Sequence, residues 1–322
     1  MPKRILELLI PVLRMVLIKK NMDMLKQKSR EYGLLLMLTL CMAFTSAVNA
    51  MVPKSEMKVL LELYSDTQGQ NWNNTWDINA PVNSWYGVTV KDGHVVEINL
   101  FRNNLVGILP ESLGDLKHLV NLNLAFNTIS GEIPKSVAEL SKLEVLKLEM
   151  NRLEGEIPSE IGNMKSLVRL SAFNNFLSGK IPESLGNIQT LKELNLSSNN
   201  LTGRIPNSLG ELSKLESLGL FENKLYGSIP GELGKLGNLK ELVLANNELG
   251  GSIPKEFGQL ASLQIFQIQN NNIFSFENMD SMNSGQFLVF DYDKVETENK
   301  YKDFDAIKTR MADTKFEDEI EE

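Results

Sequence analysis

The chain has 322 residues and a net charge of −8, and the charge is unevenly distributed. Residues 1–50 contain eight Lys or Arg against three acids, so the remaining residues carry a charge of −13. Because binding to nucleic acid requires clustered cations that neutralise phosphates, this acidity argues against a nucleic-acid partner. The length allows two ordinary domains or one elongated array of repeats.

Residues 1–50 have the pattern of a secretory signal peptide. A basic start precedes the apolar run "GLLLMLTLCMAF" and the small residues "TSAVNA", which predicts cleavage after Ala50. The apolar run is too short to favour a membrane span, but an uncleaved N-terminal anchor stays open as an alternative, and Met22 or Met24 as the true start. The cysteine of the chain, Cys41, lies in this segment, so the mature chain would contain no disulfide. We therefore expect a secreted or cell-surface protein.

Residues 51–93 hold all three tryptophans and differ from the rest of the chain. The stretch "VLLELY" at 59–64 predicts a short helix, and "VTVKDGHVVEI" predicts a hairpin that turns at Asp92-Gly93. We expect Trp72, Trp76 and Trp85 to form an N-terminal cap that keeps the following apolar residues from water.

A 24-residue repeat occupies the middle of the chain. It is marked by an asparagine that recurs without insertion at Asn103, Asn127, Asn151, Asn175, Asn199, Asn223, Asn247 and Asn271. In each repeat a Leu-x-Leu alternation predicts a strand, and looser apolar spacing after a proline predicts a helical turn. One strand and one turn cannot bury their apolar side chains alone, so the repeats must stack. We expect each asparagine amide to form hydrogen bonds with backbone groups that have no partner in the regular strand pairing.

The repeat, "LxxLxxLxLxxNxLxGxIPxxLxxL" over residues 95–272, resembles the leucine-rich repeat class of plant receptor ectodomains, secreted inhibitor proteins and some secreted bacterial proteins. The segment "LLELYSDTQGQNWNNTW", with "WYGV" after it, resembles the N-terminal cap of that family. Asn83 and Val90 stand where that cap often carries a cysteine pair. The resemblance implies an α/β repeat solenoid, a curved array with parallel strands on its concave face and short helical turns on its convex face.

The predicted organisation has four parts: a signal peptide over 1–50, a Trp-rich cap over 51–93, eight repeats over 94–272, and a C-terminal cap with an acidic tail over 273–322. Ala172 replaces a core leucine and predicts a locally thinner core. The eighth repeat loses its glycine and Ile-Pro, which indicates that the array is closing. The segment "GQFLVFDYD" predicts one further strand.

No catalytic constellation is evident in the sequence. The two histidines, His94 and His118, lie far from any cysteine, so we expect no metal-ligand cluster and no cofactor. The glycines recur in repeat columns and do not form a phosphate-binding loop. We therefore predict that the protein is not an enzyme.

Strand alternation leaves an outward face whose residues the repeat does not prescribe. Eight coils at about 4.8 Å each make this face roughly 35 Å long, enough for a protein interface. The predicted partner-binding residues on it are Phe101, Arg102, Phe126, Met150, Arg169, Phe173, Phe221 and Glu222. Exposed apolar groups are typical anchors and charges typically add selectivity. Ordinary surface variation is the competing explanation.

These features predict a non-catalytic protein that binds another protein, or a glycan, on its concave face. The alternative is an inhibitor of a secreted hydrolase such as a cell-wall-degrading enzyme. Contact with a membrane is expected only if the N-terminal segment remains as an anchor.

Overall fold

The computed structural model describes residues 52–282 and 287–293, so the predicted signal peptide and most of the acidic tail lie outside the described residues. The described chain begins with helix α2 (Lys54–Asp66), which includes the predicted helical stretch. Strands β1 (Val88–Lys91) and β2 (His94–Asn99) form the predicted antiparallel hairpin. Asp92 and Gly93 have φ values of 52° and 80° at its turn, as a two-residue hairpin loop of the primed type requires.

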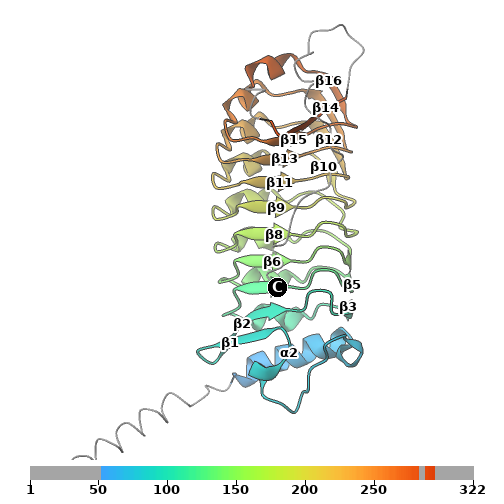
Figure 1. Cartoon of the computed structure of the whole chain (residues 1–322), viewed down its shortest axis with the longest axis vertical. Helices are drawn as coiled ribbons and strands as arrows, with labels where there is room; N and C mark the ends of the chain where they lie inside the picture. Colours follow the sequence, from blue (N-terminus) through green and yellow to red (C-terminus); the bar gives the residue numbers. More distant parts are fainter. Residues whose placement is uncertain (1–51, 283–286, 294–322) are drawn as a thin grey trace, which may run out of the picture. The chain divides into compact units, whose positions relative to one another are not determined.

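A ten-stranded sheet extends through the described chain, as the stacked arrows in Figure 1 show. After β2 its strands are β4 (Asn121–Asn123), β6 (Val145–Lys147), β8 (Arg169–Ser171), β9 (Glu193–Asn195), β11 (Ser217–Gly219), β13 (Glu241–Val243), β15 (Ile265–Gln267) and β17 (Val289–Asp291). From β2 onward the pairing is parallel and in register; Leu218 aligns with both Leu194 and Leu242. The prediction of stacked parallel strands is confirmed.

Short 3-10 helices follow the prolines of the repeats, where the sequence predicted helical turns. They are η3 (Glu111–Asp115), η4 (Lys135–Glu139), η5 (Ser159–Asn163), η6 (Glu183–Asn187), η7 (Asn207–Glu211), η8 (Gly231–Lys235) and η9 (Lys255–Gln259). The fixed φ of proline suits the residue before a helix, and it has no N–H to leave unpaired there. The apolar repeat positions are buried between these turns and the sheet, and Ala172 is buried among them.

Two smaller parallel sheets form where the chain leaves the main sheet, and the sequence analysis missed them. One contains β3 (Val106–Ile108), β5 (Thr128–Gly131) and β7 (Arg152–Leu153). The other contains β10 (Thr202–Gly203), β12 (Lys224–Ser228), β14 (Glu248–Ser252) and β16 (Asn272–Ser275). Isolated bridges, Glu156 to Ser178 and Lys180 to Thr202, lie between the two sheets.

The recurring asparagine joins each coil to the one before it. The Asn199 amide nitrogen donates to the carbonyls of Ala172, Leu196 and Ser197 at 3.0–3.1 Å. Its side-chain oxygen accepts the Leu177 backbone N–H at 3.0 Å. These bonds satisfy buried backbone groups in two coils at once, as predicted from the sequence.

The N-terminal end of the array is closed by aromatic packing without a disulfide. Trp76 stacks on Trp85 at 4.7 Å between ring centroids and meets Trp72 edge-on at 4.9 Å. All three are buried, and each indole N–H donates to a backbone carbonyl. The three tryptophans therefore form one buried cluster at this end of the array.

The C-terminal end is closed by β17 and a second aromatic cluster. β17 pairs in parallel with β15, which places the predicted extra strand in register with the repeats. Phe266 packs against Phe290 at 5.6 Å and against Phe287 at 6.3 Å. The Asp293 carboxylate accepts the backbone N–H groups of Asn270 and Asn271 at 2.9 and 3.1 Å, so it replaces the backbone carbonyls of a following coil that accept the equivalent N–H groups of Asn246 and Asn247.

Replacing Asn199 by Ala should lower the free energy of unfolding by about 2–4 kcal/mol, because it leaves buried carbonyls and an N–H without partners. Urea unfolding followed by circular dichroism measures this loss. The neighbouring Asn200→Ala is the matched control, since the half-buried Asn200 side chain accepts a hydrogen bond from the exposed Lys224 amine and its backbone bond to Leu177 is kept in the variant. Equal losses in the two variants would contradict the role assigned to the amide.

Candidate binding face

The sheet face is the set of outward positions of the ten-stranded sheet, six, four, two and one residues before each repeat asparagine. All eight predicted partner-binding residues lie on this face. Phe101, Phe173 and Phe221 occupy the position two before the asparagine, Arg169 lies in β8, and Arg102, Phe126, Met150 and Glu222 occupy the position directly before the asparagine.

Backbone hydrogen bonds continue past the ends of the strands and hold these positions in place. The N–H groups of Arg102 and Phe126 donate to the carbonyls of Ala125 and Glu149 at 3.0 and 2.9 Å, and that of Met150 donates to Phe173 at 2.9 Å. The side chains therefore start from a backbone that is fixed in every coil.

The residue before each asparagine has a left-handed backbone conformation. Arg102, Phe126, Met150 and Glu222 have φ values between 49° and 58°, and Asn246 has 57°. This conformation costs a residue other than glycine or asparagine about 1–2 kcal/mol. The left-handed conformation recurs before every repeat asparagine. Arg102, Phe126, Met150 and Glu222 therefore lower the stability of the fold relative to glycine or asparagine at these positions.

The apolar residues of the face are less exposed than predicted. Only Phe126 of the five is exposed; Phe101, Met150, Phe173 and Phe221 are half-buried, which corrects the expectation of an exposed apolar trail. Side chains of neighbouring coils cover one another: the Phe101 and Phe126 rings meet edge-on at 5.1 Å. Phe101, Phe126, Met150 and Phe173 come from successive coils, whereas Phe221 lies two coils further along.

The charged residues of the face are also oriented by their neighbours in adjacent coils. The Arg169 guanidinium donates to the Glu193 carboxylate at 2.8 Å, and the Ser198 hydroxyl donates to Glu222 at 2.8 Å. Arg102 is exposed and directly follows Phe101 in the sequence. Cross-strand pairs of this kind fix the direction in which a charge faces solvent.

Burial perturbs the ionisation of Glu241, which lies in β13 of the sheet face. Burial raises the pKa of its carboxyl group, the nearby Glu193 carboxylate raises it further, and the hydrogen bond from the Ser217 hydroxyl at 3.1 Å opposes the rise. The folded protein thus favours the protonated form of Glu241.

A group of three metal-ligand-type side chains lies where the N-terminal cap meets the first repeats. The sequence predicted no metal-ligand cluster at His94 and His118, and this prediction is wrong. Glu56 of α2 and the two histidines each place one potential ligand atom within 4.8 Å of the others. The 24-residue spacing of the two histidines is the signal that they stack in adjacent coils. No periodicity in the sequence indicates that Glu56 joins them.

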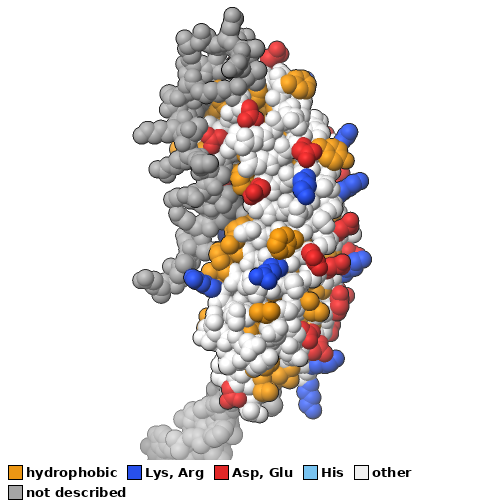
Figure 2. Space-filling view, turned by 90° about the vertical axis from the view of Figure 1, so that its right-hand side faces the viewer, with side chains coloured by type: hydrophobic (Ala, Val, Ile, Leu, Met, Phe, Trp, Pro, Cys, Tyr) orange, Lys and Arg blue, Asp and Glu red, His pale blue; other side chains and the backbone are white. Residues whose placement is uncertain are grey.

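On the side of the array that carries the two smaller sheets, the residues drawn in colour form no continuous apolar patch. Figure 2 shows apolar side chains there as separate groups among Lys, Arg and acidic side chains. Exposed apolar residues of this scattered kind are normal on protein surfaces.

Comparisons with known proteins agree with the repeat geometry. The family model described as "Leucine-rich repeat region" matches residues 99–228, and the model described as "Leucine Rich Repeat" matches residues 238–260. The chain is a leucine-rich repeat protein. A comparison with curated proteins gives no match.

Several solved structures resemble this leucine-rich repeat protein. The ectodomain of the membrane receptor kinase GASSHO1/SCHENGEN3 from Arabidopsis thaliana, in complex with CASPARIAN STRIP INTEGRITY FACTOR 2, is 34% identical with a TM-score of 0.69 over 74% of this chain and 29% of that one. The plant peptide hormone receptor RGFR1, in complex with RGF2, is 33% identical with a TM-score of 0.55 over 58% and 30%. The Leptospira interrogans protein LIC12759 is 32% identical with a TM-score of 0.52 over 60% and 47%.

The leucine-rich repeat protein spans less than half the length of these three structures, so it matches a part of each. Its likeness is to leucine-rich repeat proteins of the plant-receptor type, whose ectodomains bind ligands. Among the described residues, no helix has the length and apolar content that crossing a bilayer requires.

Replacing Arg102 by Asn should raise the free energy of unfolding by about 1 kcal/mol, because Asn adopts the left-handed conformation at lower cost. Chemical denaturation measures the gain. Arg204→Asn, at an exposed site outside the left-handed positions, should give no such gain. A gain in both variants, or in neither, would contradict the assigned strain.

Replacing Glu241 by Gln should stabilise the protein at about pH 8 and leave it unchanged near pH 3. The raised pKa means that wild-type stability is fully present below the ordinary value of 4.5 and falls as pH rises through the folded pKa. Thermal unfolding across this range measures the difference. The exposed Glu222→Gln serves as control, and a pH-independent effect of Glu241→Gln would contradict the prediction.

Proposed function

We propose that this leucine-rich repeat protein acts outside the cell, secreted or on the cell surface, as a non-catalytic module whose sheet face binds an extended peptide segment of another protein. The contact residues are Phe101, Arg102, Phe126, Met150, Arg169, Phe173, Phe221 and Glu222.

The observation that carries this proposal is the Phe101–Phe126 pair on a fixed backbone. Aromatic and arginine side chains contribute most of the binding energy at protein interfaces, and the exposed Arg102 directly follows Phe101 of the aromatic pair in the sequence. Since the backbone ladder already orders these residues, a ligand loses little free energy in ordering the receptor.

The peptide ligand is supported by the similar structures. RGFR1 is described as a peptide hormone receptor in complex with RGF2, and the GASSHO1/SCHENGEN3 ectodomain is in complex with CASPARIAN STRIP INTEGRITY FACTOR 2. An extended peptide can lie across successive coils, since the sheet face repeats about every 4.8 Å. The polar pairs on either side of the aromatic residues then select its charged side chains.

Selection of a displayed random-peptide library on the purified chain tests the proposal. We expect enriched peptides that bind wild type and bind the double variant Phe101→Ser/Phe126→Ser at least about 100-fold more weakly, the loss of roughly 3 kcal/mol that truncated hot spots produce. Phe176→Ser is the matched control, because Phe176 is a more exposed phenylalanine outside the sheet face, and it should retain binding.

Equal binding by all three proteins would contradict the assignment to the sheet face. Failure to enrich any peptide, together with binding to an oligosaccharide array or inhibition of cell-wall-degrading hydrolases, would replace the peptide ligand with the glycan or inhibitor alternative. Circular dichroism of each variant checks that it is folded.

A further inference from the structure

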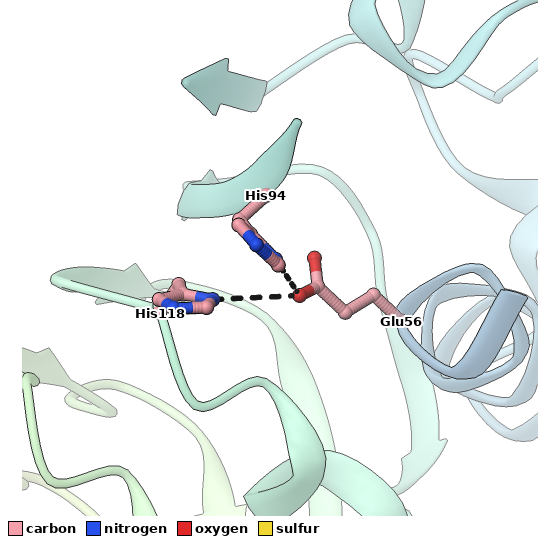
Figure 3. A group of neighbouring side chains, drawn as sticks. All are labelled: Glu56, His94 and His118. Carbon is pink, nitrogen blue, oxygen red and sulfur yellow. Dashed lines mark hydrogen bonds and ion pairs between the residues drawn. The ribbon is translucent and has the colours of Figure 1, made fainter. Parts of the chain in front are cut away.

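Three ligand-type side chains, one from the N-terminal cap and two from the first repeats, converge on one point. Figure 3 shows the Glu56 carboxylate reaching from α2 toward the imidazole rings of His94 and His118. His94 begins β2, and His118 lies between η3 and β4. Their donor atoms lie within 4.8 Å of one another.

The carboxylate of this cluster is buried, with Glu56 only 5% exposed. One oxygen lies 2.6 Å from His94 Nδ1, and the other accepts the Val95 backbone N–H at 2.8 Å. A buried carboxylate without a positive partner is strongly unfavourable, so this site favours a cation.

The second imidazole is incompletely satisfied. His118 Nδ1 is buried and makes no hydrogen bond within the described part of the chain, and its distance to the Glu56 oxygen is 3.8 Å. The two ring centroids are 3.6 Å apart, so two protonated imidazoles would repel one another strongly at this distance. A buried nitrogen aimed at a carboxylate, without a hydrogen bond of its own, indicates that a partner belongs there.

We propose that Glu56, His94 and His118 bind one Zn²⁺ ion. Two imidazole nitrogens and one carboxylate oxygen form a ligand set that zinc takes with a water molecule in the fourth position, whereas Ca²⁺ and Mg²⁺ prefer oxygen ligands. Zinc bonds of about 2.0–2.2 Å place neighbouring ligand atoms roughly 3.4 Å apart, so small side-chain rotations bring the present atoms to that geometry. The ion would replace the short Glu56–His94 hydrogen bond and satisfy His118 Nδ1.

The site would act as a cross-link. It would join the cap helix, the second strand of the hairpin and the following coil, and residues 52–322 contain no cysteine to supply a disulfide in the cap. A metal that binds the folded cap more tightly than the unfolded chain stabilises the fold by mass action.

The test uses the full chain carrying Cys41→Ser, so that the thiol does not compete for zinc. Titration with Zn²⁺ against a chromophoric chelator should give one ion per chain, and the thermal midpoint should rise with zinc and fall again with EDTA. Because the chain contains only two histidines, NMR should show both sets of imidazole signals shifting together.

His118→Gln is the decisive variant, because its Nδ1 makes no hydrogen bond whose loss would destabilise the metal-free protein. We expect at least about 10-fold weaker zinc binding, loss of the zinc-dependent rise in midpoint, and an unchanged midpoint in EDTA. Lys142 occupies the same repeat position in the next coil, so Lys142→Gln is the matched control and should bind zinc as wild type does.

Two outcomes would overturn the proposal. One is an equal zinc affinity of wild type and His118→Gln, which would place the ion on other side chains. The absence of zinc binding by both proteins would overturn it in the same way. The other is an equal fall in the midpoint of His118→Gln with zinc and with EDTA, which would make the cluster a packing contact.

Discussion

The hydrogen bonds of the repeat asparagine are the interaction on which the other features of this protein depend. From Asn127 to Asn271, each amide donates to three carbonyls and accepts at least one backbone N–H where the chain leaves the main sheet, as Asn199 does, and it links two coils in doing so. It thereby fixes the 24-residue register, and the register stacks equivalent side chains of successive coils in columns that run along the array. The columns in turn create the left-handed positions and side-chain pairs of the sheet face.

Much of this fold could be predicted because its causes are local and periodic. The Leu-x-Leu alternation, the prolines and the tryptophans each have one structural role at one spacing. The small sheets could not be predicted, since a strand such as Thr202–Gly203 is too short to show alternation and contains glycine. Closure by Asp293 was also missed, because it follows Asn271 by 22 residues and so breaks the period.

The sheet face could be predicted as a set of positions, although its contacts could not. Alternation identified Phe101 and Phe126 as outward residues, whereas their edge-on contact depends on ring orientation. The 24-residue spacing does contain information on pairs: Arg169 with Glu193, and His94 with His118, are equivalent residues of neighbouring coils. Glu56 lies outside the repeats, so only the packing of α2 reveals its place beside the histidines.

We propose that the repeat positions with a fixed residue build the scaffold and that the other positions of the sheet face bind the ligand. Hydrogen–deuterium exchange of the chain with and without a selected peptide tests it most directly. We expect added protection in the segments around residues 99–103, 123–127 and 147–151, which contain Phe101, Phe126 and Met150. Protection confined to the 3-10 turns, such as Ser159–Asn163 and Glu183–Asn187, would contradict it.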